Sequence, residues 1–250
     1  MLEMTNKKGD RRNFMSYMVV IKNVNGIVMA SDSYSTYPDR TLKDSNYKKI
    51  HCLIPNVLCV GITGINQVYV GKELVDINGT LLEYFRAVSD KNIADIVKKY
   101  SEFLKITCDR EYKDMRLMVA YKKTLYRVDI MHNNKPFIEF YKENELDIIT
   151  SGEEEHIVSG LRDFTCSDMF SSLEEALKTC IQSVKNEILL EKNLYPKNQR
   201  AVGGKVQYVV IDYSKFKRPS KNSRFMSEAD VPSSSLKIIS NDIFTYIFDN

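Results

Sequence analysis

The sequence predicts an α+β fold in which helices cover both outer faces of two stacked antiparallel sheets. The first observation behind this prediction is the order of the expected elements, which runs strands, two helices, strands, two helices and strands. The second is composition, because 43% of the 250 residues are hydrophobic and such a chain buries a substantial core. No internal repeat marks a second unit, so we predict one domain over residues 16–250.

The first half of the chain opens with a predicted β-hairpin. Its two apolar runs, over about 16–23 and 26–33, meet at Asn25-Gly26, a pair that favours tight hairpin turns. Beyond a polar loop, the remaining elements expected in this half are strands near 48–53 and 56–62, a helical stretch over roughly 65–88 interrupted at Asn78-Gly79, and a helix over about 92–107.

The second half is a β-rich block followed by helices and a buried strand. Ser172 and Glu175 have the spacing of a capping box, which predicts a helix from there to about Lys192. Three glutamates after Gly152 suit the first turn of another helix, where the helix dipole favours anions. The other elements expected here are strands over 116–121, 125–130, 137–140, 147–152 and 206–211, and a surface loop over 214–235.

Charge, hydropathy and cysteine content exclude several classes of protein. The 36 Lys and Arg residues nearly balance the 33 Asp and Glu residues, so nothing indicates a nucleic-acid partner. No apolar run is long enough to cross a membrane, and the polar N-terminus lacks the apolar centre of a signal peptide. Five cysteines without a CxxC pair predict a reducing, cytoplasmic location. Three scattered histidines predict no metal site, and we expect no cofactor.

A hydroxyl, a carboxylate and an amine stand at the ends of the first predicted strands. Ser16 opens the first strand, Asp32 closes the second, and Lys49 precedes the third. Brought together, these three groups can form a nucleophilic site. Taken singly, each also fits an ordinary role, as a strand-edge serine, a turn cap and a solvated loop lysine.

This order and spacing resemble the proteasome β-type subunits and their simpler bacterial relatives, a branch of the N-terminal nucleophile (Ntn) hydrolases. The family pattern is a first-position Thr or Ser, a Gly turn, an apolar strand ending in Asp-Ser or Asp-Gly, and a Lys-Lys-Val/Ile. Here it reads Ser16, Gly26, Asp32-Ser33 and Lys48-Lys49-Ile50, with further similar segments at 56–64, 149–152 and 203–204. The resemblance implies a four-layer αββα Ntn-hydrolase sandwich.

The resemblance implies that a free Ser16 supplies both the nucleophile and the base. Its Oγ attacks a carbonyl carbon, and its own α-amine takes the proton directly or through water. A charged Lys49 nearby lowers the pKa of the amine and of the hydroxyl. Asp32 holds Lys49 charged and oriented.

Five further residues receive roles from the same resemblance. A backbone N–H of Thr63 or Gly64 stabilises the oxyanion. Ser151 forms a hydrogen bond near the amine, although a helix N-cap is an equally suitable role for it. Tyr47 and Gly61 lie beside the substrate pocket.

The function implied is hydrolysis of peptide bonds in peptides or unfolded proteins, inside a ring-shaped homo-oligomer. An ATPase regulator is compatible with this reading. Two alternatives stay open: a catalytically inactive, proteasome-like structural subunit, and an Ntn amidase that acts on a small amide. The inactive subunit is favoured by departures from the family pattern, since Gln199, Val202 and Tyr34 stand where active members usually carry Asp, Ser and Arg.

The catalytic reading requires that Ser16 become the first residue. Residues 1–15 form a polar extension, and two routes remove it. One is autocleavage, although Met15 stands where the family usually has glycine. In the other, Met15 is the initiator and is removed because Ser16 is small. On that hypothesis Arg11-Arg12 is a translated ribosome-binding sequence, and residues 1–14 are a mis-annotated start.

Overall fold

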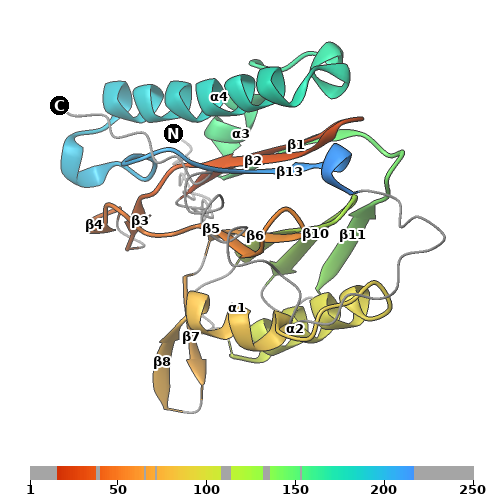
Figure 1. The fold of residues 1–250 in the computed structure, drawn as a ribbon. Helices are drawn as coiled ribbons and strands as arrows, with labels where there is room; N and C mark the ends of the chain where they lie inside the picture. The colour runs from red at the N-terminus through yellow and green to blue at the C-terminus, as the bar shows by residue number, and fades with distance from the viewer. Residues whose placement is uncertain are drawn as a thin grey trace, which may run out of the picture.

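The computed structural model describes residues 16–37, 40–64, 66–70, 72–107, 114–131, 136–152 and 154–216. These residues form four layers in the order helices, sheet, sheet, helices (Figure 1). The predicted α+β sandwich of two stacked antiparallel sheets is therefore confirmed. The predicted extension over 1–15 and most of the predicted surface loop, from 217 onward, lie outside the described residues.

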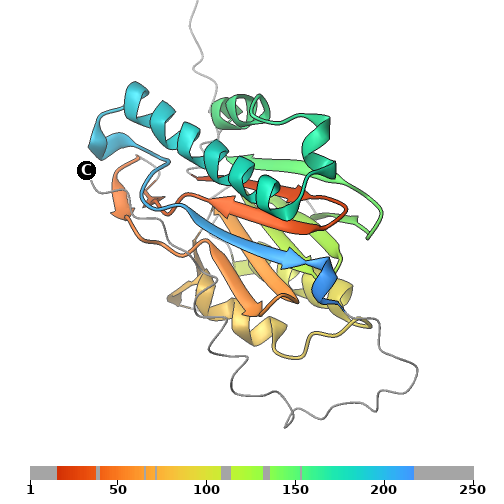
Figure 2. The ribbon, with the colours of Figure 1, turned by 45° about the horizontal axis from the view of Figure 1, so that its top comes forward.

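Two antiparallel sheets form the centre of the molecule. The first sheet has the strand order β12-β1-β2-β13, and the second has the order β11-β10-β9-β6-β5. The strands of the first sheet are β1 (Tyr17–Lys22), β2 (Gly26–Ser31), β12 (Asp147–Gly152) and β13 (Gln207–Asp212). Those of the second are β5 (Ile50–Ile54), β6 (Leu58–Gly64), β9 (Asp114–Tyr121), β10 (Thr124–Met131) and β11 (Phe137–Tyr141). The edge strands β13 and β5 run along the same side of the molecule (Figure 2).

Helices cover the outer face of each sheet. The first sheet is covered by α3 (Glu154–Leu161) and α4 (Leu173–Leu194), and the second by α1 (Ile77–Phe85) and α2 (Ile93–Thr107) (Figure 1). The capping box predicted for α4 is present, since Ser172 Oγ accepts from Glu175 N at 3.2 Å and Glu175 Oε2 accepts from Ser172 N at 2.9 Å. Three short 3₁₀ helices are η1 (Cys166–Phe170), η2 (Lys197–Gln199) and η3 (Tyr213–Lys215). No helix among the described residues combines the length and apolar character needed to cross a membrane.

Three layers of apolar side chains hold the four layers together. One lies between α4 and the first sheet, one between the two sheets, and one between the second sheet and α1 and α2. Every residue of β1 and β2 is buried because the first sheet is covered on both faces. The apolar runs that predicted these strands therefore reflect burial on two sides rather than one.

The predicted hairpin of β1 and β2 is confirmed, but its turn differs from the expected Asn-Gly turn. The carboxamide of Asn23 accepts hydrogen bonds from Asn25 N at 2.8 Å and from Gly26 N at 2.9 Å. Asn23 N also donates to Gly26 O at 2.9 Å. The turn is thus closed by an asparagine side chain, and neither Asn25 nor Gly26 adopts a positive φ.

The helix predicted over 65–88 is wrong in its first part. That part contains a hairpin of β7 (Gln67–Val70) and β8 (Glu73–Asp76), and α1 begins only at Ile77. The Val-Tyr-Val run of β7 is rich in residues that favour strands. Asp76 then caps α1 by accepting from Asn78 N at 2.8 Å, so the helix begins where an interruption was expected. A second small hairpin, β3 (Ser35–Thr36) with β4 (Leu42–Asp44), lies in the predicted polar loop.

Candidate active site

The carboxylate of Asp32 is the centre of the site. Asp32 follows β2 directly and is fully buried. Its Oδ1 accepts from Lys49 Nζ at 2.6 Å and from Tyr17 N at 3.0 Å. Its Oδ2 accepts from Tyr34 N at 3.0 Å and from Gly203 N at 3.1 Å. Four donors therefore compensate a charge that would otherwise be costly to bury.

Lys49 is held in place by its backbone as well as by its ammonium group. It lies directly before β5, and its side chain is only 3% exposed. Its N–H donates to Gln207 Oε1 at 2.9 Å, and its carbonyl accepts from Ile62 N at 2.9 Å. Burial lowers the pKa of Lys49 below its ordinary value, although the charge and hydrogen bond of Asp32 oppose this shift. The lysine is thus fixed opposite Asp32 and gives up a proton more readily than an exposed lysine.

Ser16 is connected to this ion pair through the next residue in the chain. Tyr17 N–H donates to the same oxygen of Asp32 that accepts from Lys49. Ser16 is 3% exposed. Gly152 lies opposite Tyr17, and a Cβ on Gly152 would stand 2.4 Å from the carbonyl oxygen of Ser16. A glycine is therefore required where β12 passes the start of β1.

Thr63 and Ser151 form a hydrogen bond between the two sheets. Thr63 comes from β6 in the second sheet and Ser151 from β12 in the first, and both are buried. Their hydroxyl oxygens are 2.6 Å apart. Ser151 pairs with Met18, two residues after Ser16, so this hydrogen bond lies near the start of β1. Gly64 ends β6 with φ 91°, a backbone conformation that residues other than glycine rarely adopt.

The two residues predicted to line a substrate pocket have different surroundings. The Tyr47 hydroxyl is buried and donates to Asn66 O and to Asp76 Oδ1, each at 3.3 Å. Burial, and then the neighbouring Asp76, raise the pKa of Tyr47. Tyr47 thus connects the polar loop to the start of α1. A Cβ on Gly61 would lie 2.6 Å from Met18 Sδ, so Gly61 faces side chains packed between the sheets.

Gly203 follows the buried Val202, and its close contacts explain why this position is a glycine. Its N–H donates to Asp32, and its carbonyl accepts from Ser33 N at 3.0 Å. A Cβ there would lie 2.5 Å from the ring of Tyr34. Gly203 therefore contacts the Asp32 carboxylate through its N–H and the next residue, Ser33, through its carbonyl. Val202 itself is buried among apolar side chains, and Gln199 lies exposed in η2.

Gln207 and Arg116 are site neighbours that the sequence analysis did not single out. Gln207 in β13 accepts from Lys49 N and donates through Nε2 to Tyr47 O at 2.6 Å. Arg116 pairs with Thr63 across β6 and β9, forms an ion pair with Asp129, and donates to the carbonyl of residue 150 at 3.1 Å. The signal in the sequence was a polar residue inside each apolar strand.

Among the described residues, no three His, Cys, Asp or Glu side chains gather closely enough to hold a metal ion. The groups near the start of β1 are a buried ion pair, Asp32 with Lys49, and a hydrogen-bonded hydroxyl pair, Thr63 with Ser151. Groups of these kinds can serve acid–base and nucleophilic chemistry.

Comparison with known proteins identifies the fold. No protein-family model and no curated protein matches the sequence. The structure is similar to Anbu (ancestral beta-subunit) from Yersinia bercovieri, with a TM-score of 0.51 and 15% identity over 78% of this chain and 82% of that one. It is also similar to the Anbu (Gly-1) mutant from Hyphomicrobium sp. strain MC1, with a TM-score of 0.50 and 17% identity over 94% of this chain and 100% of that one. The chain therefore has the fold of these Anbu proteins, in which two stacked sheets are covered by helices on both outer faces.

Proposed function

We propose that this chain is a proteasome-type Ntn peptidase in which Ser16, once it is the first residue, hydrolyses peptide bonds. The observation that carries this proposal is the shared oxygen of Asp32. That oxygen accepts both from Lys49 Nζ and from the N–H of Tyr17, the residue bonded to Ser16. A buried cation is thus held beside the position where a nucleophile with its own amine would stand.

The proposed reaction is acyl transfer to Ser16. The hydroxyl oxygen attacks the peptide carbonyl carbon while the α-amine of the same residue takes the hydroxyl proton, directly or through water. An N–H of Thr63 or Gly64 stabilises the oxyanion, and the proton passes to the leaving amine. Water then hydrolyses the acyl-enzyme. Lys49 keeps the α-amine largely neutral by charge repulsion, since an unperturbed α-amine has a pKa of about 8.

Ser151 is assigned a positioning role through Thr63. A hydroxyl-to-hydroxyl distance of 2.6 Å couples the proposed oxyanion strand to the strand that faces Ser16. Tyr47 is assigned to the wall of the substrate pocket, where its buried hydroxyl keeps the loop before Lys49 against α1. Gly61 contributes by leaving room for Met18 between the sheets rather than by touching substrate.

The proposed setting is a cytoplasmic, ring-shaped homo-oligomer that acts on peptides or unfolded proteins, with an ATPase regulator as a further type of partner. The similarity to Anbu (ancestral beta-subunit) supports a beta-subunit-like assembly. The exposed apolar side chains of α3 and α4 are suited to contacts between copies; they are Val158, Leu161, Leu189 and Leu194.

A catalytically inactive subunit is the second candidate, and two positions favour it. Val202 is apolar and buried, and the exposed Gln199 makes no contact with Asp32 among the hydrogen bonds of the described residues. Neither side chain therefore supports an amine on Ser16. An amidase for a small amide is a third candidate, which differs in substrate size alone.

The decisive experiment compares the full chain with the chain expressed from Met15. Intact mass shows whether Ser16 is the first residue, and an epoxyketone probe reports activity because it must react with both a hydroxyl and a free α-amine. We expect labelling of the shorter chain, none of the full chain while residues 1–15 remain attached, and none of the Ser16→Ala variant. If Ser16 is free but remains unlabelled and hydrolyses neither peptides nor small amides, the inactive subunit is correct. Turnover of small amides alone would identify the amidase.

A further inference from the structure

Cys52 and Cys59 stand directly opposite each other on two neighbouring strands. They are register partners in the antiparallel pair of β5 and β6. Both side chains pack in the apolar layer between the two sheets, so they project from the same face of the second sheet. Opposed residues of an antiparallel pair have Cα atoms about 4.5–5.5 Å apart, within the span of about 4.4–6.8 Å that a disulfide bridges. The backbone therefore already places the two thiols where a disulfide needs them.

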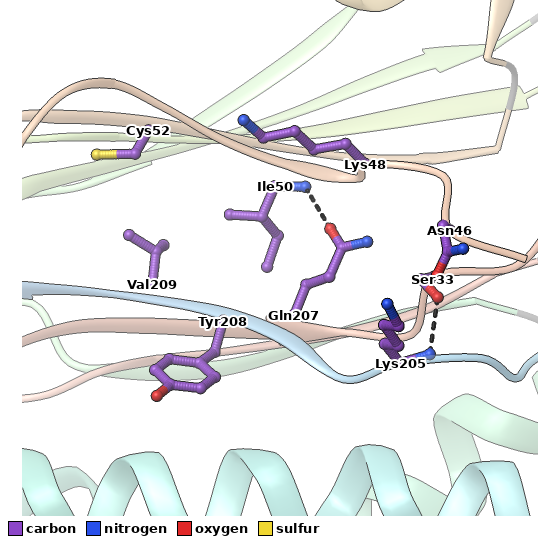
Figure 3. A pocket seen from close by; sticks show the side chains of 9 residues that line it. All are labelled: Ser33, Asn46, Lys48, Ile50, Cys52, Lys205, Gln207, Tyr208 and Val209. Carbon is purple, nitrogen blue, oxygen red and sulfur yellow. Dashed lines mark hydrogen bonds between the residues drawn. The ribbon is translucent and has the colours of Figure 1, made fainter. Parts of the chain in front are cut away.

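The two thiols differ in their access to solvent. Cys59 is fully buried, whereas Cys52 is half-buried. Cys52 also lines a cavity of about 330 Å³ between β5 and β13, the edge strands of the two sheets, and Cys59 does not (Figure 3). Two other residues that line this cavity, Asn46 and Lys48, are exposed, so the cavity is open to solvent. A small solute can therefore reach Cys52 before it reaches Cys59.

The surroundings of Cys52 favour its thiolate, which is the reactive form of a cysteine. A hydrogen bond from the Cys59 thiol lowers the pKa of Cys52. A hydrogen bond from the backbone of Asn56 and the charge of Lys48, whose side chain extends toward Cys52, act in the same direction (Figure 3). Burial opposes these effects without outweighing them. The same contact and burial raise the pKa of Cys59, so Cys52 is the first of the two thiols to react.

We propose that Cys52 and Cys59 are a peroxide-sensitive pair that forms a reversible disulfide between β5 and β6. An accessible thiolate beside a second thiol that can react with it is the arrangement found in redox-sensing cysteines. Disulfides that form in a reducing compartment are usually transient ones of this kind. The pair can form this disulfide whether or not Ser16 is active.

The proposed oxidation has two steps. In the first, the Cys52 sulfur attacks one oxygen of hydrogen peroxide, the O–O bond breaks, and the leaving hydroxide takes a proton to become water. In the second, the Cys59 thiol loses its proton and attacks the sulfur of the Cys52 sulfenic acid, the S–O bond breaks, and a second water leaves. The two sulfurs together lose two electrons, which reduce the peroxide to water. A dithiol such as dithiothreitol restores both thiols by thiol–disulfide exchange.

The first test follows the tryptic peptide that carries both cysteines. No Lys or Arg lies between Lys49 and Lys72, so residues 50–72 form one peptide. The reduced full chain is treated with hydrogen peroxide, and the remaining thiols are blocked with N-ethylmaleimide before digestion. We expect this peptide to carry no maleimide and to be about 2 Da lighter than its unlabelled reduced form, because two hydrogens are lost. Dithiothreitol should restore both maleimide labels.

The rate and the site of the reaction decide the first test. Disulfide formation should be about tenfold faster than the oxidation of free cysteine, because an ordinary thiol is only a few per cent thiolate near pH 7. Cys166, which is exposed in η1, is the reference thiol in the same molecule. An unchanged 50–72 peptide at a peroxide dose that oxidises Cys166 would overturn the proposal. Sulfinic acid at Cys52 with a labelled Cys59, or a bond from Cys52 to another cysteine, would also overturn it.

The second test separates the two steps with variants at residue 59. In Cys59→Ser a hydroxyl still donates to Cys52 but cannot form the disulfide, so the sulfenic acid should accumulate and react with dimedone. In Cys59→Ala the donor is lost too, and dimedone labelling of Cys52 should be about fivefold slower.

Cys166→Ser is the matched control, which should form the disulfide as the unmodified chain does, and circular dichroism checks that each variant is folded. If dimedone labels Cys52 in the unmodified chain as strongly as in Cys59→Ser, Cys59 does not react with the sulfenic acid and the proposal is wrong. Equal labelling rates in the two variants at residue 59 would contradict the activation of Cys52 by its partner.

Discussion

Two buried charge clusters lie beside the first sheet, and their cations have different surroundings. The carboxylate cluster is Asp32 with Lys49. The histidine cluster is His156 of α3 with Glu187 and Glu191 of α4, which approach the two ring nitrogens at 2.5 Å and 2.8 Å. In the carboxylate cluster one anion, Asp32, accepts from four donors. In the histidine cluster the ring of His156 lies between two anions, Glu187 and Glu191.

The pKa shifts of the two cations have opposite signs. Burial lowers the pKa of Lys49, and one aspartate does not overcome this effect. Burial also acts to lower the pKa of His156, but hydrogen bonds and charges of Glu187 and Glu191 outweigh it and raise the pKa to about 9. His156 therefore holds its proton more tightly than an exposed histidine, whereas Lys49 holds its proton less tightly than an exposed lysine.

Tyr17 joins the two clusters. Its N–H donates to Asp32 on one side, and its hydroxyl forms a 2.8 Å hydrogen bond with Ser183 of α4 on the other. Its ring also lies near His156, with ring centroids 6.3 Å apart. Tyr17 therefore links the carboxylate cluster, which we propose to be catalytic, to the histidine cluster.

Loss of the Asp32 charge is expected to have the largest effect. In Asp32→Asn, Lys49 becomes a buried cation without an anion, and an NH₂ group replaces one acceptor. We expect the free energy of unfolding to fall by about 3–5 kcal/mol, as is usual when one partner of a buried ion pair is removed. Urea denaturation measures this change.

The Asp32→Asn/Lys49→Met variant sharpens that result. Because the unpaired cation is also removed, it should recover part of the stability lost in the single variant. If the double variant is as unstable as the sum of the two single variants, the two residues are not coupled.

The histidine cluster predicts a loss of stability at alkaline pH. The folded pKa of His156, about 9, exceeds its unfolded value of 6.5, so its contribution is fully present below about pH 6.5 and is lost as pH rises through about 9. The stability advantage over His156→Gln should shrink by on the order of 3 kcal/mol between pH 6 and pH 10.

The pKa of Lys22 is lowered to about 8, so this group titrates in the same range. Its contribution cancels when the unmodified chain and the His156→Gln variant are compared at the same pH. His51→Gln is the matched control, since burial lowers the pKa of His51 to about 4 and the folded protein keeps this group neutral across the range. In this range the contribution of His51 changes only near pH 6.5, where the unfolded histidine titrates, and it has the opposite sign, because stability rises with pH there. An advantage of His156 that does not change with pH would contradict the charged cluster.

The close approach of Gly203 to Tyr34 predicts a steric effect of intermediate size. In Gly203→Ala the new Cβ would lie 2.5 Å from the Tyr34 ring, so the strand end around Asp32 must shift. We expect destabilisation by about 1–3 kcal/mol in thermal or urea unfolding. Gly79→Ala is the control, because its Cβ would meet only Val75 at 3.9 Å and alanine favours α1. Equal effects of the two changes would disprove the close packing.

Removal of the Tyr17 hydroxyl predicts the smallest effect. Tyr17→Phe keeps the N–H donated to Asp32 but loses the hydrogen bond to Ser183. We expect a loss of about 1 kcal/mol in the free energy of unfolding, typical of one buried hydrogen bond. If epoxyketone labelling of a free Ser16 fell by much more than this change in stability explains, the two clusters would be coupled in function as well as in structure.

Features that depend on residues close together in the chain can be predicted from the sequence more reliably than features that depend on distant residues. The capping box of α4 and the β1–β2 hairpin depend on residues a few positions apart, and both were predicted. The Val-Tyr-Val run before α1 was misassigned because its strand partner, β8, is itself short and adjoins a helix. Local patterns are weakest where two kinds of element meet without a proline or a long polar loop.

The sequence of α4 contained a signal for the histidine cluster that the predictions did not use. Glu187 and Glu191 continue the stripe of buried residues that runs through Ala176, Cys180 and Val184 on one face of α4. Two carboxylates at i and i+4 on the buried face of a helix require a buried partner. The identity of that partner, His156, could not be read from the sequence because His156 lies 31 and 35 residues before the two glutamates and contacts them only through the packing of α3 against α4.

The sequence by itself determined the order of strands and helices, because alternating and helical apolar patterns record which faces are buried. It also placed Ser16, Asp32 and Lys49 at strand ends with a spacing that resembles one family of hydrolases. The tertiary structure alone decided which donors reach Asp32, where Gln207 holds Lys49, and that a cavity opens between β5 and β13. These features join segments far apart in the chain, so they exist only when the two sheets stack.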